Sequence, residues 1–270
     1  MSSASSAVLP AGKRPEYVIE HMEEDDPDAP AVFPHWALLE YRHMLELVGP
    51  GSTVHFTSLS HASLESLRQS LSTPSNKPQA QFELHTASIT TMMSQRGIGL
   101  DRVCLLDPKS PFAVSITDAG KHTSDTKPAQ AGGPFQLFLF GGILGDDPPR
   151  DRTSSLRQLG FPSRHLGGVQ MTTDTALGVT KRCVEDGFLL ALDDTTQQEQ
   201  QWGDAAKASA KLEWVNHPEL HFGHGESVEM PFRYMVDEER PALADGSRQP
   251  LMPHGMRQLI QNDLGRSFEF

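Results

Sequence analysis

The chain has 270 residues, 37% of them hydrophobic, and carries 23 Lys and Arg against 35 Asp and Glu, a formal net charge of -12. This length supports a large buried core, and no apolar run approaches the roughly 18 residues that a bilayer-spanning helix needs. The acidic balance argues against direct nucleic-acid binding and suits a basic partner, although acidity also serves solubility alone. Cys104 and Cys183 are too few for a disulfide framework or a cysteine metal site, so we expect a cytoplasmic protein in a reducing compartment.

Polar segments divide the chain. We expect a disordered tail over residues 1–14, a surface segment over 117–133 and a flexible insertion over 193–212, because each lacks the apolar residues that offset ordering entropy. The sequence therefore predicts a folded domain over 15–192 and a C-terminal extension over 213–270.

Short apolar runs alternate with amphipathic helical patterns, which predicts an α/β fold. The expected strands are residues 17–19, 53–57, 102–106 and 135–140, and the expected helices are 34–48, 62–71 and 171–184, followed by short strands and one helix near 254–261. The runs 102–106 and 135–140 are continuously apolar, as in a parallel sheet covered on both faces. Thr172, Thr173 and Asp174 are predicted to supply the cap and a favourable negative charge at the start of the third helix.

A glycine-rich turn follows the apolar run at 135–140, with the sequence Gly141-Gly142-Ile143-Leu144-Gly145. Glycine admits positive φ and close approach of a ligand, and ligands of open α/β sheets sit at the carboxyl ends of strands. The turn is neither a dinucleotide fingerprint nor a P-loop, so it suits a ligand without phosphate. A tight turn with no ligand explains it equally well.

Two more turns resemble binding loops. Leu106-Asp107-Pro108 ends a buried strand, and residues 166–171 bring two glycines to the start of the third helix, where backbone donors are free. Residues 146–152 add a charged, proline-stiffened segment directly after the glycine turn. An ordinary turn and a solvated charged loop remain alternatives for each.

Taken together, these blocks resemble the SPOUT methyltransferases. The matching stretches are residues 17–24, 102–108, 140–153, 170–176 and 229–234. The resemblance is closest to one branch, the fungal protein arginine N-methyltransferases that modify a KH-domain protein of the small ribosomal subunit. It implies a parallel sheet with helices on both faces, a C-terminal trefoil knot at about 135–185, and S-adenosyl-L-methionine as the cofactor. It also implies that residues 213–270 shape the substrate site.

In this family the cofactor's adenine bonds mainly to main-chain atoms of three loops. Carried onto this sequence, the resemblance implies the following cofactor-binding residues: Leu106, Asp107, Pro108, Gly141, Gly142, Ile143, Leu144, Gly145, Leu166, Gly167, Gln170, Met171 and Thr173.

An arginine acceptor needs carboxylates that fork its N–H groups and fix the guanidinium plane. We expect Glu20 or Glu23, together with Asp151, to do this, although a solvated acidic loop explains residues 23–26 as well. His217, His221 and His224 match no zinc spacing, so no metal site is predicted.

The leading hypothesis is a protein arginine N-methyltransferase acting on a small-subunit ribosomal protein. An RNA methyltransferase for tRNA or rRNA and a non-catalytic ribosome-assembly module are the alternatives, since fold does not decide function. We favour a monomer over a homodimer and expect no membrane partner.

Overall fold

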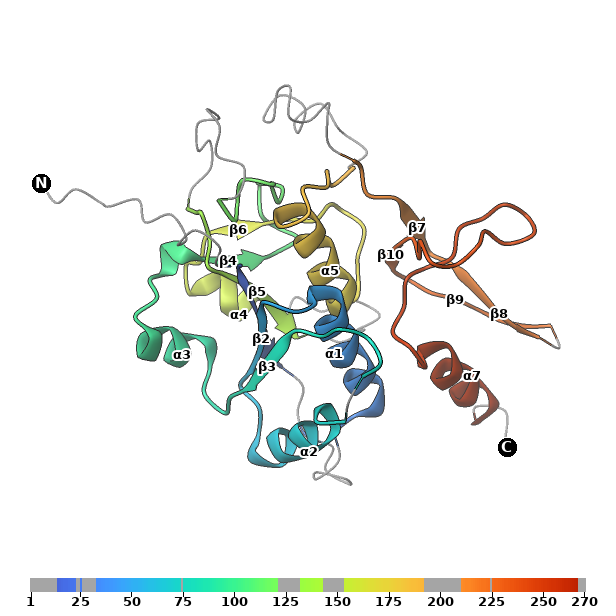
Figure 1. Cartoon of the computed structure of the whole chain (residues 1–270), viewed down its shortest axis with the longest axis horizontal. Coiled ribbons are helices and arrows are strands. Elements are labelled where there is room, and N and C mark those ends of the chain that lie inside the picture. Colours follow the sequence, from blue (N-terminus) through green and yellow to red (C-terminus); the bar gives the residue numbers. More distant parts are fainter. Residues whose placement is uncertain are drawn as a thin grey trace, which may run out of the picture.

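The computed structural model describes residues 14–22, 25, 33–73, 75–120, 132–142, 153–191, 210–223 and 225–266. A parallel sheet lies between two layers of helices, and a small C-terminal layer of strands and one helix stands beside it (Figure 1). The strands are β1 (Glu16–His21), β2 (Thr53–Thr57), β3 (Gln81–Leu84), β4 (Val103–Leu106), β5 (Leu137–Gly142), β6 (Ser163–Arg164), β7 (Trp214–Asn216), β8 (Glu219–Gly223), β9 (Glu226–Glu229) and β10 (Arg233–Met235). The helices are α1 (His35–Val48), α2 (His61–Leu71), α3 (Ile89–Arg96), the 3-10 helix η1 (Leu100–Arg102), α4 (Ser154–Gln158), α5 (Thr173–Val184) and α7 (Met256–Arg266).

The main sheet has six strands in the order β3-β2-β1-β5-β4-β6, and every neighbouring pair is parallel. β1 and β5 occupy the middle, and Tyr17, Val18 and Ile19 of β1 are fully buried. The parallel order places all the carboxyl ends at one edge of the sheet. The predicted α/β class and parallel sheet are confirmed.

One face of the sheet packs against α1, α2 and α5. Alternate residues of the central strands, among them Tyr17, Ile19, Phe56 and Phe138, join Tyr41 and Leu177 from these helices in one buried cluster. The other face carries Val18, Leu105 and Leu139 against Ile89 and Met92 of α3 and Leu156 of α4. Both faces are therefore covered, which explains the continuously apolar strands.

Four short elements were not predicted from the sequence. β3, α3, α4 and β6 contain between two and eight residues, too few to show a clear hydrophobic period. The predicted cap of α5 is also corrected in part. Thr172 is the cap residue by backbone position, but its hydroxyl donates to the Thr175 hydroxyl at 2.8 Å and leaves the helix N–H groups uncapped by its side chain.

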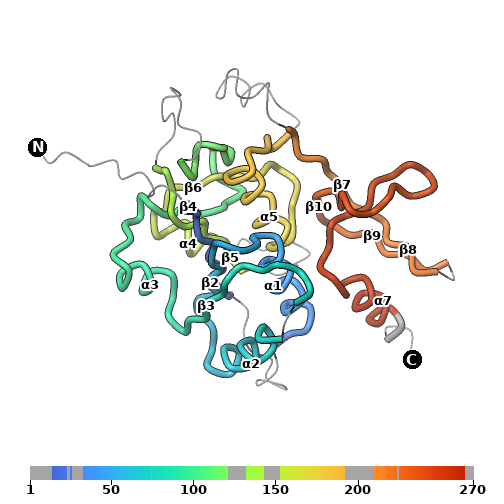
Figure 2. Tube along the Cα trace, in the orientation of Figure 1, coloured from blue at the N-terminus to red at the C-terminus, as the bar shows by residue number. Residues whose placement is uncertain are grey.

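The C-terminal region forms its own small layer. β7 pairs with β10 and β8 with β9, both antiparallel, and the tube in Figure 2 shows this orange and red part of the chain beside α1 and α5. The backbone N–H of Arg233 donates to the carbonyl of Gln170 at 2.8 Å and so joins this layer to the segment before α5. The predicted C-terminal helix is present as α7.

Several expectations fall outside the described residues. These are the tail up to residue 13, the segments 121–131 and 192–209, and the stretch 143–152, through which the predicted knot would pass. The knot and the domain boundaries stay predictions. Among the described helices, none is long and apolar enough to cross a membrane.

Candidate active site

A cavity of about 380 Å³ opens at the carboxyl ends of β4 and β5. Its lining comprises Leu106, Asp107, Pro108, Lys109, Phe140, Gly141, Thr153, Arg157, Leu166, Gly167, Gly168, Val169, Gln170, Met171, Thr173 and Ala176. Three separate segments, which follow β4, end β5 and precede α5, thus converge on one space. This is the edge where open parallel sheets bind ligands.

The turn after β4 is held by an ion pair. The buried carboxylate of Asp107 accepts hydrogen bonds from Arg157 Nε at 2.5 Å and Arg157 Nη2 at 2.8 Å, and from the backbone N–H of Lys109 at 3.0 Å. Arg157 belongs to α4, so this fork fixes α4 against the end of β4. Because these hydrogen bonds already occupy the Asp107 carboxylate, we expect its role to be holding the shape of the cavity wall.

The loop before α5 is fixed at both ends. It starts after Arg164, which is 1% exposed and lies 3.0 Å from the Asp118 carboxylate, and it ends at the Gln170 carbonyl that Arg233 binds. Between these anchors Gly167 has φ +105°, a conformation that favours glycine. At the next position, Gly168, a Cβ atom would meet no atom within 4 Å, so the backbone there stands open.

The structure gathers most of the predicted cofactor residues around this cavity. Those in the lining are Leu106, Asp107, Pro108, Gly141, Leu166, Gly167, Gln170, Met171 and Thr173. Gly142 lies at the end of β5 but not in the lining; a Cβ there would lie 2.8 Å from the Glu20 carbonyl, so its glycine serves strand packing. Ile143, Leu144 and Gly145 lie outside the described residues.

The lining also includes residues that were not predicted to bind the cofactor, among them Lys109, Thr153, Arg157 and Ala176. Thr153 and Arg157 come from α4 and its start, and the half-buried Ala176 comes from the first turn of α5. The periodicity of α5 was a usable signal for Ala176, because it lies three residues after Thr173. Nothing in the sequence marked Arg157.

Of the three predicted guanidinium-binding acids, only Glu20 lies within the described residues. Glu20 is 7% exposed, and its carboxylate accepts from Thr57 Oγ1 at 2.5 Å, Ser58 Oγ at 2.6 Å and the Ile89 N–H at 2.9 Å. These bonds tie β1 and β2 to the first turn of α3, which is a structural role. Glu23 and Asp151 lie outside the described residues. A catalytic role for any of the three stays a prediction.

A buried polar cluster lies where α1, α5 and β10 meet. His43 Nδ1 is 2.6 Å from Asp174 Oδ2, while Asp174 Oδ1 and Glu40 Oε2 have no hydrogen-bond partner among the described residues. Burial, and then the charge of Asp174, raise the pKa of Glu40 well above its usual range. Burial and the charges of Asp174 and Glu40 also raise the pKa of Tyr234. Asp174 directly follows Thr173 of the cavity wall in sequence, but neither Asp174 nor Glu40 belongs to the lining, and both carboxylates are buried.

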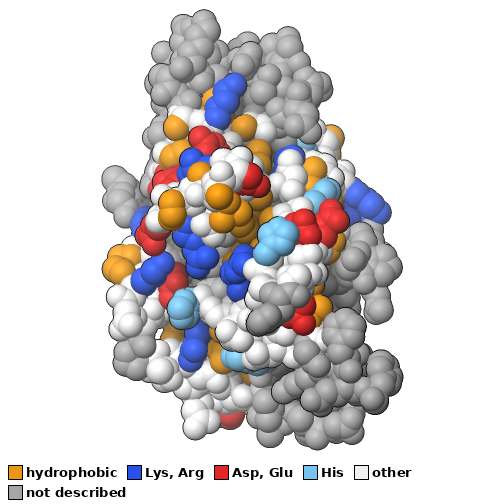
Figure 3. All heavy atoms as spheres, turned by 90° about the vertical axis from the view of Figure 1, so that its right-hand side faces the viewer, with side chains coloured by type: hydrophobic (Ala, Val, Ile, Leu, Met, Phe, Trp, Pro, Cys, Tyr) orange, Lys and Arg blue, Asp and Glu red, His pale blue; other side chains and the backbone are white. Residues whose placement is uncertain are grey.

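A wider hollow of about 1240 Å³ separates α1 and α5 from the C-terminal region. Figure 3 shows this side of the molecule, where Lys and Arg, Asp and Glu, and hydrophobic side chains are interspersed. The hollow's basic residues are Arg14, Lys77, Lys181, Arg182, Lys211, Arg240 and Arg248, and its acidic residues are Glu46, Glu213, Asp237, Glu238 and Glu239. The net negative charge of the chain is therefore not concentrated here.

Comparison with known proteins agrees with this geometry. A family model described as protein arginine N-methyltransferase SFM1-like matches residues 16–267. The chain is 33% identical to the protein arginine N-methyltransferase SFM1 of Saccharomyces cerevisiae over 268 residues, which cover 94% of this chain and 98% of the relative.

Solved structures of the yeast arginine methyltransferase SFM1 are similar as well. The complex with SAM matches with a TM-score of 0.63 and 30% identity over 92% of this chain and 91% of that chain. The complex with SAH matches with a TM-score of 0.63 and 30% identity over 91% and 94%. The chain therefore belongs to the SFM1-like family of protein arginine N-methyltransferases.

Proposed function

We propose that this chain is a protein arginine N-methyltransferase that binds S-adenosylmethionine in the cavity at the carboxyl ends of β4 and β5. The observation that carries the proposal is the convergence of the turn after β4, the end of β5 and the loop before α5 on one space of about 380 Å³. The yeast relative has been crystallised with SAM, with SAH and with MTA.

The described lining suits an adenosine. Leu106, Leu166, Val169 and Met171 offer apolar walls for a base, and the open backbone around Gly168 offers donors and acceptors for its edge. Lys109 belongs to the lining and precedes Ser110, but the sequence has no complete P-loop pattern, in which glycines precede a Lys-Ser or Lys-Thr pair. The mainly apolar and main-chain lining therefore suits an adenosine better than a phosphate chain.

S-adenosylmethionine supplies a methyl group on a sulfonium centre, which is a good leaving group, so the protein's task is to align and desolvate the acceptor. Orientation can contribute roughly 7–11 kcal/mol to lowering such a barrier.

We propose a basic protein as the substrate, specifically a KH-domain protein of the small ribosomal subunit. The net charge of -12 supports a basic partner, while the mixed charges of the wide hollow make RNA an alternative worth testing. The experiment is incubation with isotopically labelled S-adenosylmethionine and purified small-subunit proteins or RNA, followed by mapping of the label by mass spectrometry. Label on arginine supports the proposal, and label on RNA alone overturns it.

Calorimetry with S-adenosylmethionine tests the non-catalytic alternative. Micromolar binding together with turnover supports the enzyme, whereas the absence of binding favours a ribosome-assembly module.

A further inference from the structure

Outside the cavity, a compact group of possible metal ligands lies at the β2–β3 edge of the sheet. Among the described residues, His55, Glu83 and His85 are the group of three or more such side chains whose ligand atoms lie within 4.8 Å of one another. We propose that these three residues bind a divalent transition-metal ion, with Zn²⁺ the best match. This proposal is independent of the methyltransferase activity.

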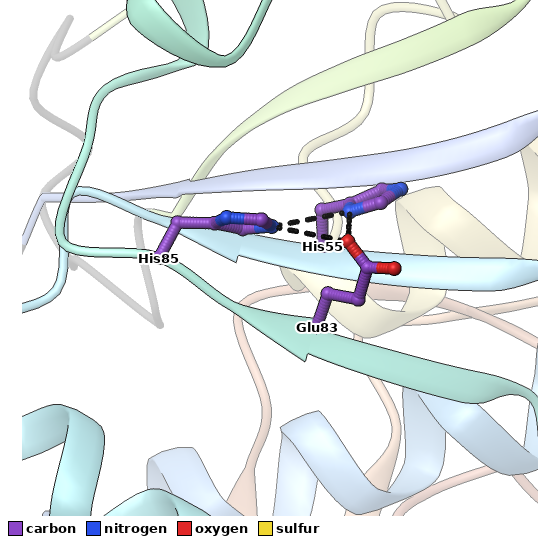
Figure 4. Close-up of side chains that lie close together, drawn as sticks. All are labelled: His55, Glu83 and His85. Atoms are coloured by element: carbon purple, nitrogen blue, oxygen red, sulfur yellow. Dashed lines mark hydrogen bonds and ion pairs between the residues drawn. The ribbon is translucent and has the colours of Figure 1, made fainter. Parts of the chain in front are cut away.

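Strand pairing explains why the three side chains meet. His55 of β2 is the direct partner of Glu83 on β3, and His85 follows Glu83 by two residues, so all three point to one face of the sheet. Figure 4 shows their polar ends pointing toward one another, His55 from β2, Glu83 from β3 and His85 from the residue directly after β3. Phe82 and Leu84, the alternate residues, pack on the hydrophobic core of the opposite face.

The distances fit one face of a tetrahedron. His55 Nδ1 lies 3.3 Å from His85 Nε2 and 3.2 Å from Glu83 Oε2, and His85 Nε2 lies 3.5 Å from the same carboxylate oxygen. Tetrahedral Zn²⁺ with bonds of about 2.0–2.1 Å requires ligand atoms about 3.3 Å apart. Two histidines and one carboxylate are also a ligand set that Zn²⁺ commonly takes, with a fourth position left for water.

The second nitrogen of His55 is oriented as a metal-bound histidine requires. Its Nε2 lies 2.8 Å from Glu16 Oε2, and Arg96 Nη2 is 2.7 Å from the same oxygen. The carboxylate of Glu16, at 2.8 Å, is a nearer partner of His55 Nε2 than Arg96 Nη1, at 3.3 Å, so we assign the proton to Nε2, and Nδ1 then presents its lone pair to Glu83 and His85. Carboxylates that bind the far nitrogen in this way fix the ring of metal-binding histidines. Glu16 also neutralises Arg96, whose Nη1 lies 3.3 Å from His55 Nε2 and would otherwise repel a cation.

The three proposed ligands differ in how far their side chains are exposed to solvent. The His55 side chain is 2% exposed, while those of His85 and Glu83 are 25% and 58% exposed, so an ion can enter from solvent onto a fixed inner ligand. Without a bound ion, the lone pairs of the three ligand atoms, which lie within 3.5 Å of one another, repel each other unless one of the atoms carries a proton. A bound ion would join the edge strand β3 to β2 and thereby stabilise this end of the sheet.

The test uses the full chain after treatment with a chelator and dialysis. Titration with Co²⁺ alone is followed by visible absorption, with Zn²⁺ as the competitor. We expect one Co²⁺ per chain, the intense bands of tetrahedral cobalt, their loss on adding Zn²⁺, and a higher Tm with either metal.

Glu83→Gln and His85→Ala remove partly exposed ligands, and His61→Ala removes an exposed histidine at the start of α2 as a matched control. Each ligand substitution is expected to weaken Co²⁺ binding at least 10-fold, while His61→Ala leaves it unchanged. Circular dichroism of the metal-free variants checks their fold. Absence of tetrahedral cobalt bands at millimolar Co²⁺, or binding that survives both ligand substitutions, overturns the proposal.

Discussion

The two ends of the main sheet carry sites of opposite construction. At the β4–β5 end, three loops surround a cavity whose shape comes largely from main chain, glycines and apolar side chains. At the β2–β3 edge, the polar atoms of His55, Glu83 and His85 converge across one strand pair, with Glu16 and Arg96 behind them.

The difference shows what each kind of site demands of a sequence. A cavity bounded by backbone is built from short contiguous turns, so each of its walls can be recognised as a local sequence motif. A cluster of side chains also needs a register between strands: Glu83 and His85 are two residues apart, but His55 lies 28 residues before Glu83 and joins them only because β2 pairs with β3. Four substitutions, at Ala176, Asp174, Glu20 and His21, separate residues that serve the cavity from residues that serve the fold.

Filling the cavity is expected to have the largest effect. Ala176→Leu adds apolar atoms to the cavity wall at a helical position where leucine is well tolerated. We expect the affinity for S-adenosylmethionine, measured by calorimetry, to fall at least about 100-fold, equivalent to about 2.7 kcal/mol. Ala62→Leu on α2 is the matched control and is expected to change nothing. Unchanged affinity in Ala176→Leu would place the cofactor elsewhere.

Removing the charge of Asp174 tests the buried polar cluster where α1, α5 and β10 meet. Asp174→Asn keeps an oxygen for His43 but removes the charge from their hydrogen bond. Hydrogen bonds to charged groups contribute about 1.5–3 kcal/mol, so we expect the free energy of unfolding to fall by about that amount, with little change in cofactor affinity. Urea unfolding and calorimetry together make this distinction. Unchanged stability in the variant would show that the charge of Asp174 does not hold α1 against α5.

Glu20, on the strand between the two sites, is expected to act on stability. Glu20→Gln replaces an acceptor of three hydrogen bonds and places an amide NH₂ against the donors Thr57, Ser58 and Ile89. We expect the free energy of unfolding, measured in urea, to fall by about 1–3 kcal/mol. Glu65→Gln on the exposed side of α2 is the control. If Glu20→Gln instead abolishes turnover at unchanged stability, Glu20 is the guanidinium-binding acid that the sequence suggested.

His21, the last residue of β1, gives the fold a pH dependence. Burial lowers the pKa of His21 to about 4, against an opposing effect of Asp25. The unfolded chain therefore binds the proton first, so this contribution to stability is complete above pH ~6.5 and is lost as the pH falls toward ~4. At pH 5 we expect a loss of about 2 kcal/mol relative to pH 7.

His21→Gln should remove that loss while keeping a partner for the Tyr41 hydroxyl, which lies 2.8 Å from His21 Nδ1. Urea unfolding at both pH values measures the effect, with the exposed His35→Gln as the control. Equal pH dependence in wild type and His21→Gln would show that His21 titrates normally in the folded protein.

The sequence by itself determined the parallel α/β class, the long helices and most of the cavity wall. Apolar runs such as Phe138–Phe140 and the turns at Asp107-Pro108 and Gly167-Gly168 consist of contiguous residues, so they can be recognised in the sequence without the structure. Family resemblance added the cofactor and the arginine acceptor, which no spacing alone implied.

Tertiary structure alone decided which side chains meet. Arg157 reaches Asp107 across 50 residues, Asp174 meets His43 across 131, and His55 faces Glu83 only because β2 and β3 pair in that register. The bonds of Glu20 likewise became visible only when α3, too short to be periodic, was placed against β1. Packing fixes these contacts through the summed burial of residues distant in sequence, and no short window of sequence contains that information.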